Sequence, residues 1–144
     1  MRPIRTLAAA GALLLAGCSL ILPPNDPSPS EPAIGVGTAT WALSADEEIG
    51  PETQSFTAFV TERDCASGRS SQGRIVGPSI DYEADAVVVT FGVRGLGGVQ
   101  SCPSNPATRV EVRLREPLGQ RALLDGGLGD RQEPPVCEAS PNCI

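Results

Sequence analysis

The sequence contains no histidine and no lysine. Histidine is the commonest general base and metal ligand, so neither a Ser-His-Asp triad nor a Cys-His dyad can form within this chain. Every cationic side chain is therefore an arginine. The only methionine is Met1. The lack of lysine beside abundant Arg, Ala, Gly and Pro is typical of a protein from a GC-rich genome.

Long apolar runs are also missing. Residues 7–16 are an uncharged apolar run, but a hydrocarbon core of about 30 Å takes roughly 20 residues of helix. Arg2 and Arg5 precede this run, as in the charged segment of a signal peptide. Residues 15–18 are Leu-Ala-Gly-Cys and match a bacterial lipobox at every position. We therefore expect cleavage after residue 17, lipidation of Cys18 and a lipid-anchored location on the extracytoplasmic face of the cell membrane. An ordinary secretory signal that happens to contain a cysteine is the alternative.

The excess of acidic residues limits the possible partners. Without residues 1–17 the chain carries 9 arginines against 17 acidic residues, a net charge of −8. Nucleic acid and anionic headgroups both attract clustered cations, so this average charge argues against both. The expected partners are the membrane, through the N-terminal lipid, and an envelope protein or ligand that the sequence does not identify.

With Cys18 lipidated, an even number of cysteines remains, as expected of disulfides in an exported chain. They are Cys65, Cys102, Cys137 and Cys143, and three connectivities are possible. The short spacing between Cys137 and Cys143 favours a bridge between these two, with Cys65 paired to Cys102. A four-cysteine zinc site is the rival interpretation, although no C-x-x-C spacing supports it.

Composition divides the chain into four parts. Residues 1–17 are the predicted lipoprotein signal peptide. Residues 18–34 hold the lipidated cysteine and a proline-rich tether. In the polyproline conformation residues 19–33 would span about 45 Å at about 3.1 Å per residue. Residues 35–128 form the predicted domain, and residues 129–144 form a C-terminal tail with two cysteines.

Period-two alternation of apolar residues predicts strands in the domain, without any helical period longer than a turn. The expected strands cover residues 38–44, 56–62, 74–82, 86–94, 109–115 and 120–124. Trp41 is expected in the core, and the strands around residues 83–85 are expected to form a hairpin. Short strands joined by Gly/Pro turns predict an all-β fold, a small antiparallel β-sandwich (Ig-like) of six to seven strands. A small β-barrel is the alternative.

Three blocks, at residues 65–69, 102–106 and 116–126, resemble those of uncharacterised actinobacterial secreted proteins and lipoproteins. That group shares a C-x-x-G, a later C-x-x-N-P and a terminal P-L-G-x-R-x-L-x-D-G, and the resemblance covers about residues 38–127. It implies export and a bridge between Cys65 and Cys102, and it transfers no activity.

Candidate sites are few. Asp81, Glu83 and Asp85 alternate in a way that could feed oxygens to Ca²⁺, but Ala86 and Gly92 replace the Gly and Glu of an EF-type loop. A solvated hairpin turn is favoured there, and no metal or other cofactor is expected. The acidic residues of 46–52 are interpreted as another solvated loop.

Residues 68–74 could hold an anion on two arginines and backbone amides. Without a following helix or a P-loop lysine, a disulfide-anchored surface loop is the better interpretation. The favoured function is a non-catalytic binding or structural role in the cell envelope. An inhibitor that presents residues 95–105 to an envelope hydrolase is the alternative, and a small extracytoplasmic hydrolase is the third hypothesis.

Overall fold

Seven strands form one sheet in the computed structural model, which describes residues 35–127 and 129–137. The strands are β1 (Val36–Ser44), β2 (Ser55–Glu62), β3 (Ile75–Tyr82), β4 (Ala86–Arg94), β5 (Thr108–Arg113), β6 (Ala122–Asp125) and β7 (Val136–Cys137). These residues include no helix long and apolar enough to cross a membrane. The all-β class and the number of strands agree with the prediction from sequence.

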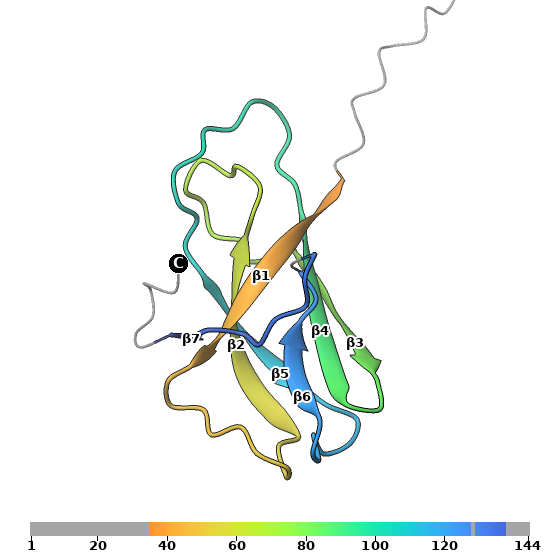
Figure 1. Cartoon of the computed structure of the whole chain (residues 1–144). Coiled ribbons are helices and arrows are strands. Elements are labelled where there is room, and N and C mark those ends of the chain that lie inside the picture. Colours follow the sequence, from red (N-terminus) through yellow and green to blue (C-terminus); the bar gives the residue numbers. More distant parts are fainter. Residues whose placement is uncertain (1–34, 128, 138–144) are drawn as a thin grey trace, which may run out of the picture. The chain divides into compact units, whose positions relative to one another are not determined.

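Five strands follow one another in the order β3-β4-β1-β2-β5, and each neighbouring pair is antiparallel. The predicted hairpin of β3 and β4 is confirmed, and a 2.8 Å hydrogen bond from the Glu83 N–H to the Ala86 carbonyl closes its turn. The sheet curls on itself (Figure 1). Beyond the end of β5, the Arg115 N–H donates to the Tyr82 hydroxyl on the last residue of β3 at 2.8 Å. The resulting half-barrel is consistent with the predicted small sandwich or barrel.

β6 and β7 depart from the antiparallel pattern. β6 runs parallel to the first half of β4, and β7 runs parallel to the last residues of β1. Both pair where β1 and β4 have separated, because β1 pairs with β4 only from Val36 to Ala39. Neither strand follows its neighbour through a tight hairpin, which would have required an antiparallel pair. β7 belongs to the segment predicted as a tail, so the sheet extends beyond residue 128.

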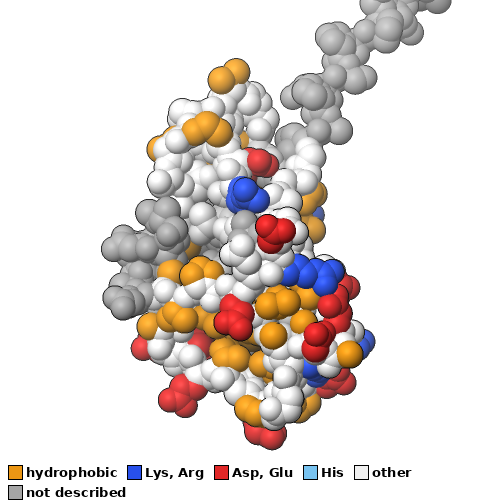
Figure 2. Space-filling model, viewed as in Figure 1, with side chains coloured by type: hydrophobic (Ala, Val, Ile, Leu, Met, Phe, Trp, Pro, Cys, Tyr) orange, Lys and Arg blue, Asp and Glu red, His pale blue; other side chains and the backbone are white. Residues whose placement is uncertain are grey.

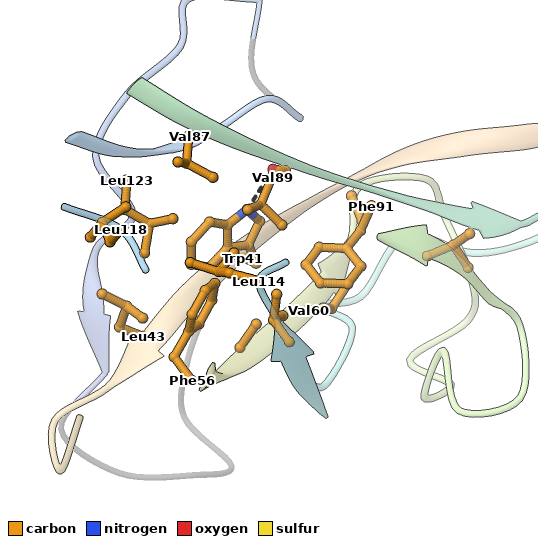
Figure 3. Close-up of a cluster of buried hydrophobic side chains, with 14 residues drawn as sticks. Trp41, Leu43, Phe56, Val60, Val87, Val89, Phe91, Leu114, Leu118 and Leu123 are labelled. Atoms are coloured by element: carbon orange, nitrogen blue, oxygen red, sulfur yellow. Dashed lines mark hydrogen bonds between the residues drawn. The ribbon is translucent and has the colours of Figure 1, made fainter. Parts of the chain in front are cut away.

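The hydrophobic core lies inside the curl (Figure 3). Trp41 is 2% exposed, and its ring stacks on Phe56 at a centroid distance of 5.5 Å and meets Phe91 edge-on at 6.4 Å. Such aromatic pairs contribute about 0.5–1.5 kcal/mol each beyond the burial of their area. The other buried members are Ala39, Leu43, Ala58, Val60, Val87, Val89, Val93, Val112, Leu114, Leu118 and Leu123. The prediction that Trp41 belongs to the core is confirmed.

Candidate functional site

Two connections leave the sheet at the same end. β2 and β4 run toward this end, and β3 and β5 run back from it, so residues 63–74 and 95–107 both lie there (Figure 1). The chain also enters the domain here, because Val36 at the start of β1 pairs with Arg94 at the end of β4. We call residues 63–74 and 95–107 the loop pair.

A disulfide joins the two loops. Cys65 is bonded to Cys102 with their Cα atoms 4.5 Å apart, which confirms this predicted bridge. The second predicted bridge, from Cys137 to Cys143, involves a cysteine outside the described residues. Cys18 and the predicted tether lie outside them as well. Of the two predicted bridges, the one between Cys65 and Cys102 therefore lies within the described residues.

Hydrogen bonds around Ser67 fix the two loops against each other. The Ser67 N–H donates to the Ser101 carbonyl at 2.9 Å, and the Ser101 N–H donates to the Ser67 hydroxyl at 3.1 Å. Gln100 Oε1 accepts from the Ser67 hydroxyl and from the Arg69 guanidinium, both at 3.0 Å. Ser67 and Gly68 have φ values of 54° and 70° and form a tight turn. A 3.1 Å hydrogen bond donated by the Arg69 N–H closes this turn. The first loop thus has a defined shape on the surface of the second.

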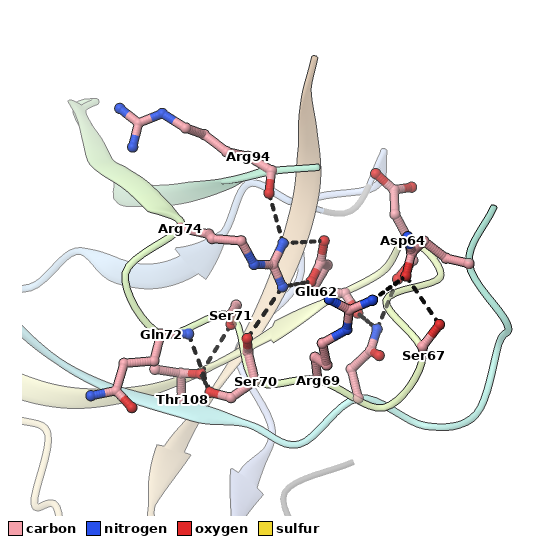
Figure 4. A network of polar contacts seen from close by, with 12 residues as sticks. Glu62, Asp64, Ser67, Arg69, Ser70, Ser71, Gln72, Arg74, Arg94 and Thr108 are labelled. Atoms are coloured by element: carbon pink, nitrogen blue, oxygen red, sulfur yellow. Dashed lines mark hydrogen bonds and ion pairs between the residues drawn. The ribbon is translucent and has the colours of Figure 1, made fainter. Parts of the chain in front are cut away.

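A buried ion pair closes the base of the first loop. Arg74 donates to both carboxylate oxygens of Glu62, at 2.9 and 2.5 Å, and to the Arg94 carbonyl at 2.6 Å (Figure 4). The side chain of Glu62 is only 2% exposed, and its hydrogen bond raises the pKa of Arg74 above the ordinary value. These contacts join the ends of β2 and β4 to the start of β3. Glu62 also neutralises Arg74, one of the two arginines considered from the sequence as partners of an anion.

The arginine and serine side chains of residues 68–74 are bonded within the protein. Arg69 binds Gln100 and Arg74 binds Glu62, while the Ser70 and Ser71 hydroxyls each lie 3.0 Å from the Thr108 hydroxyl (Figure 4). An anion would have to displace these partners. The structure therefore favours the disulfide-anchored surface loop over the anion-binding loop.

The tip of the second loop is apolar and faces solvent. Val99 is fully exposed and follows two glycines, Gly97 and Gly98. Exposed large hydrophobic residues in the described part of the chain are Val36, Val99 and Val136. Two of these three lie at the loop-pair end, because Val36 is the first residue of β1. Val36 and Val99 therefore leave apolar area exposed at this end of the domain.

The acidic residues considered for calcium lie at the opposite end of the sheet. Asp81 is in β3, while Glu83 and Asp85 are in the turn that follows, and Glu83 forms an ion pair with Arg131. Nowhere in residues 35–127 and 129–137 do three His, Cys, Asp or Glu side chains gather as metal ligands. In the acidic segment 46–52, Glu47 accepts the Thr57 N–H at 2.9 Å, so it completes backbone pairing beyond the end of β1.

Asp125 is a buried acid whose carboxylate is hydrogen-bonded to the backbone. Its carboxylate accepts the Trp41 N–H at 3.0 Å and the Gly127 N–H at 2.8 Å, where β1 has left β4. Burial raises the pKa of Asp125, and the two backbone donors oppose this shift. A β-carbon at Gly127 would overlap the Ala39 carbonyl, so only glycine lets the chain pass this close to β1. The unusual acid is therefore explained by backbone pairing rather than by chemistry on a substrate.

A hollow of about 420 Å³ lies at the end of the sheet away from the loop pair. Leu43, Ile49, Leu118, Leu123 and Val136 contribute its apolar lining. Asp125 does not line it. Glu116 does not line it either. A hydrogen bond from Arg121 lowers the pKa of Glu116. The hollow thus has an apolar wall, and neither of the two acids whose pKa is shifted lines it.

No protein-family model, curated protein or solved structure matches this chain. Sequence reasoning missed the Glu62–Arg74 pair and the contacts of Gln100, because these residues are far apart in the chain and carry no spacing signal. It found the bridge between Cys65 and Cys102.

Proposed function

We propose that this protein is an exported lipoprotein, anchored through Cys18 to the extracytoplasmic face of the cell membrane, and that it acts by binding through the loop pair. The observation that carries the binding role is the fixed shape of this surface. A disulfide, the contacts of Ser67 and the ion pair of Glu62 hold the loops before any ligand arrives. A preordered surface loses less conformational entropy on binding than a flexible one.

The charged groups support a non-catalytic role. The chain has no histidine. In the described residues the two acids with shifted pKa values are Asp125 and Glu116, and backbone amides and Arg121 respectively account for their contacts. A general acid or base needs a shifted pKa in reach of a substrate, and neither acid lines the apolar hollow.

Replacing the predicted acylation site tests the anchoring. We expect Cys18→Ala to move the protein from the membrane fraction to the soluble fraction and to abolish the processed, acylated species in mass spectra. Ser19→Ala is the matched control, since it changes the next residue without removing the thiol. An unchanged membrane fraction and unchanged processed mass in Cys18→Ala would refute the lipoprotein assignment.

An inhibitor of an envelope hydrolase is the second candidate function. The exposure of Val99 at the tip of residues 95–105, which the bridge at Cys102 constrains, favours it. Such an inhibitor would co-purify from detergent-solubilised membranes with one stoichiometric hydrolase. Val99→Asp should abolish the capture, whereas Val136→Asp, equally a change at an exposed valine, should not. Turnover of a substrate that a single Asp or Glu substitution abolishes, without any captured protein, would contradict both binding functions.

A further inference from the structure

The two ends of the domain carry opposite charge. The loop pair contains three arginines, Arg63, Arg69 and Arg74, against one acid, Asp64. The charge of Arg74 is neutralised by Glu62 at the end of β2, so the net positive charge of this end comes from the other arginines. The connections at the opposite end, residues 45–54, 83–85 and 114–121, contain seven acids against two arginines. Figure 2 agrees, since most of the acidic side chains on the visible face lie in the half away from the loop pair. The domain is thus an electric dipole whose positive end is the loop pair.

The same end combines positive charge with apolar exposure and with the entry of the chain. Arg94 is exposed at the end of β4, beside Val36, which is 59% exposed. The Gly95 N–H donates to the Gly35 carbonyl at 3.0 Å, so the N-terminal segment joins the domain next to the second loop. Val99 extends from that loop. Arginines around an apolar tip are the combination that binds the headgroup region of an anionic bilayer.

We propose that the loop pair docks on the anionic lipid surface to which the protein is anchored, an inference that rests on the proposed anchoring at Cys18. In this orientation Val99 enters the headgroup region, and the exposed arginines Arg63 and Arg94 face lipid phosphates. The acidic connections then point away from the membrane, where they form the surface presented to the envelope.

The short range of electrostatic interactions decides which end of the domain faces the bilayer. The tether predicted from the sequence would, at about 45 Å, allow either end of the domain to reach the bilayer, so its length does not select one. β4 has nine residues and spans about 30 Å, whereas charges are screened over about 8 Å at physiological ionic strength. When the loop pair faces the bilayer, the repulsion between the acids at the far end and the anionic headgroups is therefore almost completely screened. The reverse orientation would place seven acids and only two arginines against anionic headgroups.

Anchoring makes a weak contact sufficient. A domain on a short tether meets the bilayer at an effective concentration in the millimolar range, so docking needs only a modest intrinsic affinity. Each arginine near an anionic surface contributes about a fivefold factor to the docked population. The net charge of the chain predicted the opposite, because it averages over two ends that the fold separates.

A tryptophan placed at the tip tests the docking. The acylated full chain carrying Val99→Trp is bound to phosphatidylglycerol vesicles with brominated acyl chains, and Ala84→Trp in the far hairpin is the matched control. Trp41 is 2% exposed and gives the same background in both. We expect blue-shifted emission and quenching for Val99→Trp only, and loss of both on phosphatidylcholine vesicles. Unquenched Val99→Trp on sedimented vesicles, or equal quenching at both positions, would overturn the proposal.

Charge substitutions give a second readout on the same anchored protein. Arg94→Gln at the loop-pair end should lower the ratio of docked to free Val99→Trp about fivefold. Arg113→Gln removes the same charge at the end of β5 away from the loop pair, and it should leave this ratio unchanged. Equal effects of the two substitutions would refute the local contact. If the acylated chain fails to sediment with vesicles at all, the anchoring is wrong; if it sediments but Val99 stays exposed, only the docking is wrong. Protection of Val99 by a captured protein instead of lipid would also overturn the lipid proposal.

Discussion

Replacing Asp125 tests how the sheet stays intact where β1 separates from β4. The carboxylate is 1% exposed and accepts two backbone N–H groups, from Trp41 and Gly127. Asp125→Asn replaces one oxygen by an NH₂ group, so one of these donors then faces another donor. Leaving a buried donor unsatisfied costs about 1–3 kcal/mol. Asp125→Ala removes both acceptors and should cost about 2–6 kcal/mol, twice that range.

The pH dependence of this difference has a definite sign. Burial raises the pKa of Asp125 above its ordinary value of 3.8, so the folded state binds the proton more tightly than the unfolded state does. This contribution to stability is fully present below pH 3.8 and is lost as the pH rises through the folded-state pKa. Asparagine has no such proton. The advantage of the wild type over Asp125→Asn should therefore grow as the pH is lowered through this window.

Urea unfolding followed by the fluorescence of Trp41 measures these free energies. Asp130→Ala is the control, since it removes an exposed acid five residues away in the chain and should change stability by less than about 0.5 kcal/mol. A cost below about 1 kcal/mol for Asp125→Ala would refute the reasoning, because two unpaired buried donors cannot be that cheap. A pH-independent difference between wild type and Asp125→Asn would contradict the direction of the pKa shift.

Three further outcomes are expected. Replacing both Cys65 and Cys102 by alanine should lower the free energy of unfolding by about 4 kcal/mol in the loop-entropy model. Reduced wild type is the comparison and should lose a similar amount; no loss would show that the bridge does not stabilise the fold. Glu62→Ala should cost about 3–5 kcal/mol because it leaves the charge of Arg74 without its carboxylate partner, and Glu62→Leu with Arg74→Leu should recover much of that loss in urea unfolding; an equal or larger loss in the double variant would contradict this. The lowered pKa of Glu116 should give a stabilising contribution that is present above the ordinary pKa of 4.5 and lost as the pH falls through the lowered value; thermal unfolding against pH should show this for wild type and not for Glu116→Gln.

Local signals in the sequence were enough for the strands and for one bridge. Alternation in residues 86–94 reports which side chains face the core, and the observed strand has the same bounds. Trp41 could be placed in the core for the same reason. The parallel pairs of β6 and β7 could not be predicted, because their partners are set by the gap between β1 and β4. That gap depends on where β1 bends away, and no residue type marks the position.

The polar residues that complete the fold were hidden for a related reason. Asp125 and Glu47 both accept backbone N–H groups where a strand loses its neighbour, at Trp41 and Thr57. A carboxylate in such a position looks in the sequence like any other acid beside a turn. Its role depends on the unpaired donor opposite, which lies 84 residues away for Asp125 and 10 for Glu47. Acids that serve the backbone can therefore be separated from acids that serve a ligand only after the sheet is known.

The charge polarity is different, because the order of the strands alone determines it. In an antiparallel sheet successive connections alternate between the two ends. The first and third connections, residues 45–54 and 83–85, hold only acidic charges, while the second, residues 63–74, is rich in arginine and the fourth, residues 95–107, is uncharged. Assigning connections to ends therefore predicts a dipole from the sequence, even though the net charge of −8 for the chain without residues 1–17 conceals it. For a tethered domain the charge near the membrane matters within about 8 Å, so the charge of each end, and not the total, is the quantity that bears on docking.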